Sequence, residues 1–321
     1  MLIPADKEER EQLIQMREST TYWKDAMRRL RANRVAMVSF WLIVAIILFA
    51  FVGPFLMPYT YDQQVRGHER LGPSFSAEFF HPFGTDNLGR DLCVRVMMGS
   101  RISLVIGIVS TMFIVLIGTT YGAISGFIGG RVDDIMMRIC EIIYSIPTVL
   151  IIILLNIVLK EPLQKLFDAG HFEAMRSVGT GLICIFVTFA LLYWVSMARM
   201  VRGEILALKS SEYVMASTAL GAKRGWIVKK HLVPNAIGTI VVTTTFQIPS
   251  SIFTESFLSF IGLGVSAPMA SLGSLVNDAL NGFQTYPHRL FVPAAVLALI
   301  ILAMNQLGDG LRDALDPKMR G

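Results

Sequence analysis

Six stretches of the chain are almost continuously apolar, and polar, charged segments separate them. A hydrocarbon core of about 30 Å needs about 20 apolar residues in a helix, because only a helix satisfies its own backbone hydrogen bonds in lipid. The pattern therefore predicts an all-α membrane protein with six transmembrane helices. The predicted spans are Val35–Met57, Ile102–Phe127, Ile135–Leu159, Val178–Met197, Ala236–Phe260 and Leu290–Leu307.

Lysine and arginine are distributed unevenly among the connecting segments. The residues before the first span and the loop 198–235 are rich in both, whereas the segment from Ser266 to His288 contains neither. Because basic residues are retained in the cytoplasm, the N-terminus, the basic loop and the C-terminus are predicted to be cytoplasmic. The predicted divisions are a cytoplasmic tail 1–34, a first helix 35–57, an extracytoplasmic segment 58–101, a five-helix core 102–308 and a cytoplasmic tail 309–321.

The N-terminal tail has an amphipathic pattern. Trp23, Met27 and Leu30 fall at helical spacing, and basic residues occupy the other side, which predicts a helix lying in the inner interface. A basic retention signal without such a helix explains the charges equally well.

Composition excludes several classes of protein. A chain with 53% hydrophobic and 17% charged residues lies outside the soluble norm, and a net charge of +5 without one basic face argues against nucleic-acid binding. The three cysteines lack paired spacing and are interpreted as packing residues, and the five histidines are scattered over different segments, so no metal site is predicted. No phosphate-binding loop or hydrolase motif occurs, so neither ATP binding nor catalysis is expected of this chain.

Small residues and prolines mark particular points in the spans. Gly118, Gly122 and Gly126 recur every four residues, which leaves a groove for close packing of another helix. Pro147 and Pro249 each remove a backbone donor inside a predicted span, and each predicts a kink.

Glu255 is a carboxylate in a long apolar run, which makes it a candidate functional residue. Counting from Ala236 at about 1.5 Å per residue places it roughly 28 Å along the helix, close to the outer interface. A structural helix-end or gate-lining role is therefore favoured over a proton-carrying role. Gln247 and Pro249 are grouped with it as candidates for lining the gate or path.

The basic loop contains a short amphipathic segment from Ser210 to Gly221. Ser210 or Ser211 can cap its first turn, Glu212 complements the helix dipole, and Gly221 suits a left-handed closing residue. Small residues would let another protein approach the backbone, and larger apolar ones would supply contact. The small residues are Ala216, Ser217, Ala219 and Gly221, and the larger ones are Tyr213, Met215 and Leu220. A generic surface helix explains the segment equally well on these grounds alone.

The same segment carries a family motif. The run Glu212-x-x-x-Ala216-Ser217-x-x-x-Gly221, continuing to Ile227, His231, Pro234 and Asn235, resembles the cytoplasmic loop motif of binding-protein-dependent ABC importer permeases. In that family the helix inserts into a cleft of the ATPase subunit and transmits its closure to the membrane spans. Ala216-Ser217 replaces the usual double alanine, which is a small-for-small change.

Two further segments resemble the C-type permeases of dipeptide and oligopeptide importers, in the peptide/nickel transporter family. One runs from Phe83 through Arg95 to Leu104, and the other comprises residues 255–264 and 305–317. Asp86 and Asp91 alternate with Arg90 and Arg95, and the i to i+4 spacing of Asp91 and Arg95 predicts a charge-paired structure. Gly308 to Asp316 is expected to end the last span.

The resemblance, which runs from about residue 25 to the C-terminus, implies a type I ABC importer permease fold with a cytoplasmic coupling helix. It implies a bacterial inner-membrane protein that works with a B-type sister permease, two ATPases that bind ATP and Mg, and an extracytoplasmic peptide-binding protein. Oligopeptides or dipeptides are the expected cargo, with nickel chelates or other small solutes as the alternative. A proton-coupled transporter with Glu255 as carrier, or a membrane scaffold, would be competing functions.

Overall fold

The structure of the 321-residue chain is a computed structural model that describes residues 22–76, 79–169, 179–265 and 269–315. Residues 1–21 of the predicted tail, the start of the predicted fourth span at Val178 and residues 316–321 lie outside this part. The described residues are almost entirely helical, with one two-stranded antiparallel sheet.

The elements follow one another in a simple order. In the first half they are α2 (Tyr22–Ala32), α3 (Arg34–Phe51), α4 (Gly53–Leu56), β1 (Ser74–Phe75), β2 (Phe80–His81), α5 (Leu92–Ile128), α6 (Gly130–Ser145) and α7 (Thr148–Asp168). In the second half they are α9 (Thr180–Leu192), α10 (Trp194–Lys209), α11 (Glu212–Ala219), α12 (Arg224–Ile227), the π-helix η1 (Val228–Leu232), α13 (Val233–Asn235), α14 (Ile237–Phe260), α15 (Leu272–Leu280) and α16 (His288–Leu315).

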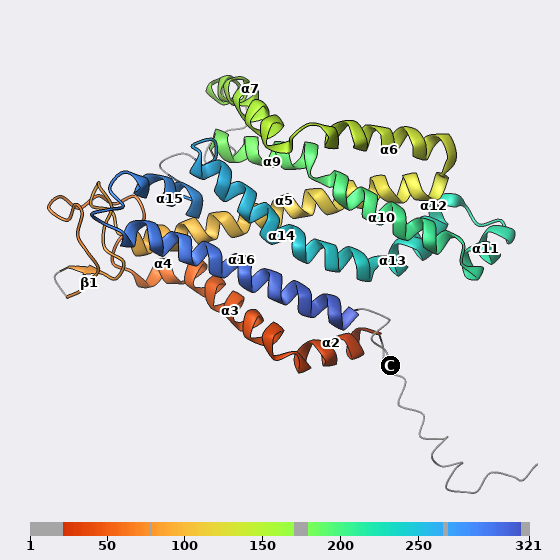
Figure 1. Cartoon of the computed structure of the whole chain (residues 1–321), viewed down its shortest axis with the longest axis horizontal. Coiled ribbons are helices and arrows are strands. Elements are labelled where there is room, and N and C mark those ends of the chain that lie inside the picture. The colour runs from red at the N-terminus through yellow and green to blue at the C-terminus, as the bar shows by residue number, and fades with distance from the viewer. Residues whose placement is uncertain (1–21, 77–78, 170–178, 266–268, 316–321) are drawn as a thin grey trace, which may run out of the picture.

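The long helices lie side by side along the long axis, and successive ones run in opposite directions (Figure 1). The strands, α4 and α15 lie at one end, called here the β1 end. Helices α11 and α12 lie at the other, the α11 end, and α2 and the last turns of α16 lie toward the same side. A Cβ atom added to Gly310 would run into the side chain of Ala36, so the two chain ends that the structure describes meet there.

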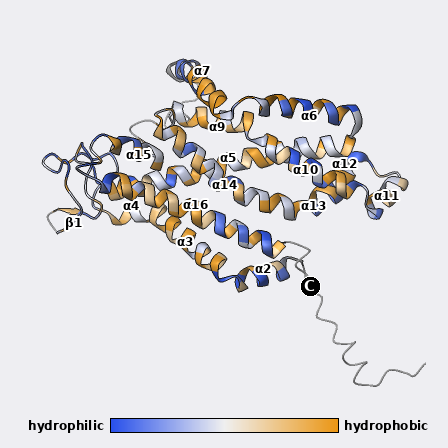
Figure 2. Cartoon of the chain, viewed as in Figure 1, coloured by the Kyte–Doolittle hydropathy of each residue, from blue (hydrophilic) through white to orange (hydrophobic). Residues whose placement is uncertain are grey.

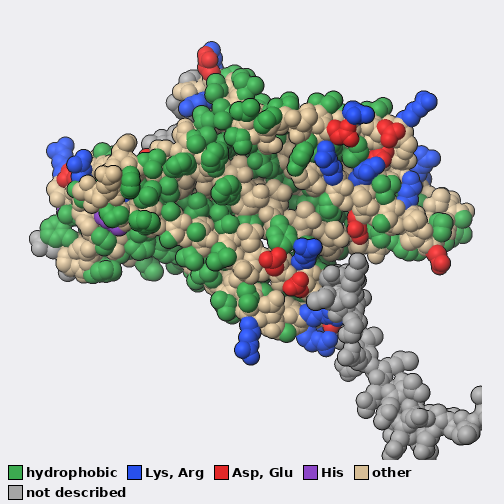
Figure 3. Space-filling view, in the orientation of Figure 1, with side chains coloured by type: hydrophobic (Ala, Val, Ile, Leu, Met, Phe, Trp, Pro, Cys, Tyr) green, Lys and Arg blue, Asp and Glu red, His purple; other side chains and the backbone are tan. Residues whose placement is uncertain are grey.

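Four helical segments are long and apolar enough to cross a membrane, and two bent pairs bring the number to six. The four are α3, α5, α9 with α10, and α16; the pairs are α6 with α7, bent by 84°, and Arg224–Asn235 with α14, bent by 63°. Hydrophobic residues cover the helices between the two ends (Figure 2). On the face in Figure 3, charged side chains gather at the β1 end, around the α11 end, at the tip of α7 and where α2 meets α16. The sequence predicted six spans, which agrees with the number obtained when each bent pair is counted as one span.

The two predicted proline kinks have different outcomes. The kink predicted at Pro147 is confirmed, because α6 ends at Ser145, α7 begins at Thr148, and the two helices are bent by 84°. Pro147 cannot donate a backbone hydrogen bond and disfavours the helical conformation of Ile146, which is extended with φ −91° and ψ 135°. In contrast, α14 continues through Pro249 without interruption.

Other helices extend beyond their predicted spans. Helix α5 begins at Leu92, so residues 92–101, which were assigned to the external segment, are helical. Asp91 starts this helix early, because its carboxylate accepts a hydrogen bond of 2.8 Å from the Val94 amide. Helix α16 continues past the predicted span end at Leu307 and ends at Leu315, within the stretch Gly308 to Asp316 that was expected to end it.

The three regularly spaced glycines of α5 pack against α10, as the sequence predicted for a close helix contact. A Cβ atom added to Gly118 would lie 2.6 Å from the Met197 Cβ atom, and one added to Gly126 would lie 2.9 Å from the Arg202 carbonyl oxygen. One added to Gly122 would collide with the Ala198 carbonyl oxygen. This contact is called the glycine seam below. The cysteines are free and buried, which agrees with a packing role.

The β1 end is held by buried ion pairs, but the predicted pairing of Asp91 with Arg95 is wrong. Asp91 caps α5 and contacts the His81 Nδ1 atom at 2.7 Å, so its carboxylate is already engaged. Arg95 pairs instead with Asp86 at 2.5 Å, and Arg90 also reaches Asp86, at 2.6 Å. The predicted charge-paired structure therefore forms with different partners.

The pKa values of Asp86 and Asp91 are shifted in opposite directions. Burial acts to raise the pKa of Asp86, but Arg95 and Arg90 outweigh it and hold that pKa below its usual range. Burial raises the pKa of Asp91, and its hydrogen bonds with Val94 and His81 offset this only in part.

Candidate docking site at the α11 end

Helix α11 ends in a hydrogen-bonded glycine motif. Gly221 has a φ of +80°, which confirms the predicted left-handed closing residue. Its amide donates to the Thr218 carbonyl at 3.0 Å, and the Ala222 amide donates to the Ser217 carbonyl at 3.1 Å. This pair of bonds is the Schellman arrangement, and it turns the chain back toward the membrane helices.

The start of α11 differs from the prediction. Neither predicted serine caps the helix with its side chain. The Ser210 hydroxyl donates to the Ala207 carbonyl at 2.9 Å and the Ser211 hydroxyl to the Leu208 carbonyl at 2.6 Å, so both satisfy the end of α10 instead. Glu212 lies in the first turn, as predicted for a residue that complements the dipole.

One side chain anchors α11 to the rest of the protein. Val214 is 2% exposed and belongs to the main hydrophobic core together with Ile227 and Leu232. Val214 does not stand out in the sequence, because a helix of only eight residues is too short for a periodic apolar pattern to be recognised. Its burial fixes which face of α11 is turned outward.

The outward face has the composition that the sequence predicted for a docking surface. Leu220 is 88% exposed, Met215 56% and Tyr213 39%. Ala216 and Ala219 are also exposed, and the Ser217 hydroxyl is engaged with the Tyr213 carbonyl at 2.7 Å. A Cβ atom added to Gly221 would meet nothing within 4 Å. The described part of the chain therefore leaves this surface uncovered.

The remaining motif residues lie behind α11, in the helical segment that leads into α14. The His231 ring lies 4.9 Å from the Trp226 ring and 6.1 Å from the Tyr213 ring, centroid to centroid, so it joins this segment to α11. The Asn235 side-chain amide donates to the His231 carbonyl at 2.6 Å, and Pro234 lies in the first turn of α13. The 63° bend into α14 follows directly.

Polar contacts join the helices α5, α6 and α10 near the α11 end. The Lys209 ammonium group donates to the Phe127 carbonyl at 2.6 Å, which links the end of α10 to the end of α5. Arg202 binds both carboxylate oxygens of Asp133 at 2.6 and 2.5 Å, and the Ser125 hydroxyl contacts the same carboxylate. These contacts join helices α5, α6 and α10, and α10 leads directly into α11.

The candidate gate residues do not join the docking site. Glu255 is fully buried in α14, where the hydroxyls of Ser103 and Ser259 donate to its carboxylate at 2.8 and 2.7 Å. Pro249 is buried and Gln247 is half-buried in the same helix. Within the described residues, no group of three His, Cys, Asp or Glu side chains has metal-binding geometry.

Comparisons with known proteins give the family. Residues 118–321 match the model of the binding-protein-dependent transport system inner membrane component, and residues 21–73 match that of the N-terminal TM domain of oligopeptide transport permease C. The fold resembles a chain from inward facing conformations of the MetNI methionine ABC transporter, with a TM-score of 0.53 and 20% identity over 70% of this chain and 96% of that one.

Curated relatives agree with these matches. The oligopeptide transport system permease protein OppC of Bacillus subtilis (strain 168) is 45% identical, over 95% of this chain and 92% of its own. The dipeptide transport system permease protein DppC of the same organism is 43% identical, over 95% and 88%. The OppC protein of Escherichia coli (strain K12) is 40% identical, over 94% and 93%. The chain therefore belongs to the inner membrane permease components of binding-protein-dependent ABC transport systems.

Proposed function

We propose that the chain forms half of the path of an ATP-driven importer for oligopeptides or dipeptides, and that α11 is its coupling helix. The observation that carries the proposal is the outward face of α11, which is small, apolar and uncovered while Val214 anchors the opposite face. A helix that is fixed on one side and bare on the other is suited to insertion into a partner's cleft.

The proposed orientation places the α11 end in the cytoplasm and the β1 end outside. Lys209, Lys223 and Arg224 lie at the α11 end, in accord with the retention of basic residues inside. The alternating helix directions and the meeting of α2 and α3 with α16 support an even number of crossings, with both chain ends cytoplasmic (Figure 1).

The partners of this machine are a B-type sister permease, two ATPases and an extracytoplasmic peptide-binding protein. ATP and Mg are bound by the ATPases, whose closure pulls α11 and, through the contacts of Lys209 and Arg202, the helices α5, α6 and α10. This motion of α11 shifts the transporter between two states only if the ATPase dimer binds one of them more tightly than the other. Peptides are the proposed cargo because the similar permeases named above transport oligopeptides or dipeptides.

Glu255 has a structural role in this proposal. Its carboxylate collects hydroxyl donors from α5 and from its own helix, with Ser271 at the start of α15 also in reach, and so clamps three helices together. Gln247 and Pro249, on the same helix, are proposed to lie toward the path, where Pro249 leaves one carbonyl without its helical partner.

The direct experiment is purification of the tagged full chain from its native membrane. Two ATPases and a second permease should copurify, and the reconstituted complex should import a tripeptide only with ATP and the binding protein present. Transport by the chain alone, driven by an ion gradient, would contradict the proposal and favour a secondary transporter.

A further inference from the structure

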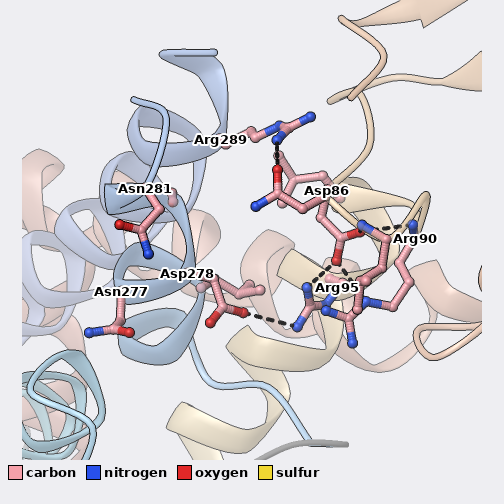
Figure 4. Close-up of a pocket in the computed structure, with 12 residues that line it drawn as sticks. Asp86, Arg90, Arg95, Asn277, Asp278, Asn281 and Arg289 are labelled. Carbon is pink, nitrogen blue, oxygen red and sulfur yellow. Dashed lines mark hydrogen bonds and ion pairs between the residues drawn. The ribbon is translucent and has the colours of Figure 1, made fainter. Parts of the chain in front are cut away.

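A polar pocket of about 310 Å³ lies at the β1 end, between the start of α5, the helix α15 and the start of α16 (Figure 4). Its charged lining consists of Arg90, Arg95, Arg289, Asp86 and Asp278, together with three asparagines. Three arginines against two aspartates leave the wall with an excess of positive charge. Its volume is at the lower end of the usual range for small-ligand pockets.

Arg289 lies in this wall without an ion pair to a described carboxylate, and the nearby charge of Asp86 acts on it only from beyond contact distance. Its side chain is 6% exposed, and its Nη1 atom donates to the Asn87 side-chain oxygen at 2.7 Å. Its Nε and Nη2 atoms have no hydrogen-bond partner, and no carboxylate of the described residues forms an ion pair with it. Its guanidinium carbon lies 4.3 Å from the Tyr286 ring centroid, and this cation–π contact does not neutralise the positive charge.

Arg95 also keeps a free donor. It is 3% exposed, its Nη1 atom contacts Asp86 at 2.5 Å, and its Nη2 atom reaches Asp278 at a long 3.4 Å, while Nε has no partner. The Asp278 side chain is 55% exposed, so this second ion pair is open to solvent. The carboxylates of the wall therefore do not saturate its guanidinium groups.

A buried guanidinium without a counterion is strongly unfavourable, and each unsatisfied buried donor calls for an explanation. In an arginine, Nε and Nη2 form the edge that grips a carboxylate through two parallel hydrogen bonds. That edge is the unpaired one in Arg289. The pocket lining therefore presents a free two-donor edge that matches one planar anion, such as a carboxylate.

We propose that this pocket binds the carboxylate of a small solute, with Arg289 as the principal donor and Arg95 as its support. The proposal rests on the proposed function for the solute's identity, which is then a short peptide that presents its C-terminal carboxylate at the outer side. Both arginines are more than nine-tenths buried in a recess, which a small ligand can enter. A docking protein with an acidic side chain would be better matched by a flat, exposed basic patch.

The test compares L-alanyl-L-alanine with its C-terminal amide as probes. Binding of each to the complete permease complex in nanodiscs is measured by calorimetry, without the binding protein. The dipeptide should bind and the amide should not. Arg289→Gln should weaken dipeptide binding roughly tenfold or more, because it removes a charged bidentate contact. Arg66→Gln is the matched control, since Arg66 is an exposed arginine outside the pocket lining and should leave the affinity unchanged.

A second variant moves affinity the other way. Asp278→Asn removes the exposed acid from the pocket wall and should tighten dipeptide binding, and a variant that merely unfolded would not do so. Equal binding of dipeptide and amide, unchanged affinity in Arg289→Gln, or a carboxylate effect that appears only with the binding protein present would each overturn the proposal. If the complex still imports peptide with ATP in any of those cases, the pocket proposal alone has failed and the importer proposal stands.

Discussion

The glycine seam and the outward face of α11 are both built from small residues, but only one of them is completed within the chain. At the seam, a Cβ atom on Gly118, Gly122 or Gly126 would press on α10. At α11, a Cβ atom on Gly221 would meet nothing within 4 Å, and Ala216 is exposed. Small residues at the seam are thus explained by folding. On α11, no described part of the chain packs against the outward small residues, and we propose that an ATPase surface does so.

The largest expected effect comes from filling the seam. Gly122→Leu would drive its side chain into the Ala198 carbonyl, and since backbone cannot give way as a side chain can, we expect a loss of more than about 3 kcal/mol of folding stability. Thermal unfolding of the purified chain in detergent measures it. Gly203→Leu is the matched control, because Gly203 lies in a helix with open space around it. Similar unfolding temperatures for the two variants would contradict a packed seam.

Next in size is the ion pair beside the seam. Asp133→Asn weakens the two-bond contact with Arg202 and removes its countercharge, which should cost about 2 kcal/mol for a part-buried pair. Asp134→Asn, at the exposed neighbouring position, should change the unfolding temperature little. Equal stabilities of the two variants would show that the pair does not join α6 to α10.

A smaller stability change with a large functional change is expected at the end of α11. Gly221→Leu places a branched side chain at a φ of +80°, which costs about 1–2 kcal/mol. ATP-dependent uptake should nevertheless be lost, because the side chain also occupies the docking surface. Asparagine tolerates the left-handed conformation, so Gly221→Asn should keep most of the stability. Normal uptake by Gly221→Leu would argue strongly against docking through α11.

The smallest stability change is expected for Glu255. Ser103 and Ser259 donate to different oxygens of Glu255, so in Glu255→Gln one hydroxyl keeps its acceptor and the other must turn to accept from the new amide group; the clamp should lose only about 1 kcal/mol. ATP-driven uptake should continue at a comparable rate, measured with and without a proton ionophore. Complete loss of uptake in this variant, with the protein still folded, would favour a proton-carrying role.

Much of the helical framework follows from the sequence, because apolar runs of spanning length have few other structures available in lipid. The glycine spacing likewise predicted a close helix contact. Pro147 shows the limit of this logic: the sequence indicates a kink, but it does not give the size of the bend, which is 84° between α6 and α7. The pairing of Asp91 failed for a related reason, since i to i+4 spacing does not reveal that the residue caps α5 and binds His81.

The docking site was predictable in composition but not in orientation. The outward residues of α11 were identified from their size and from a family motif. The burial of Val214, which fixes the orientation of α11, and the ion pair of Arg202 with Asp133 depend on contacts between residues far apart in the sequence. The free edge of Arg289 is of the same kind, because only the fold shows that its Nε and Nη2 atoms have no hydrogen-bond partner among the described residues.

The most direct test of the central claim is copurification of the ATPase subunits with the tagged Ala216→Arg chain. Ala216 is exposed, so this long charged side chain should leave the unfolding temperature and the association with the sister permease unchanged. The account predicts that the ATPases no longer copurify. Retention of both ATPases by this variant, at the level of the unmodified chain, would contradict it.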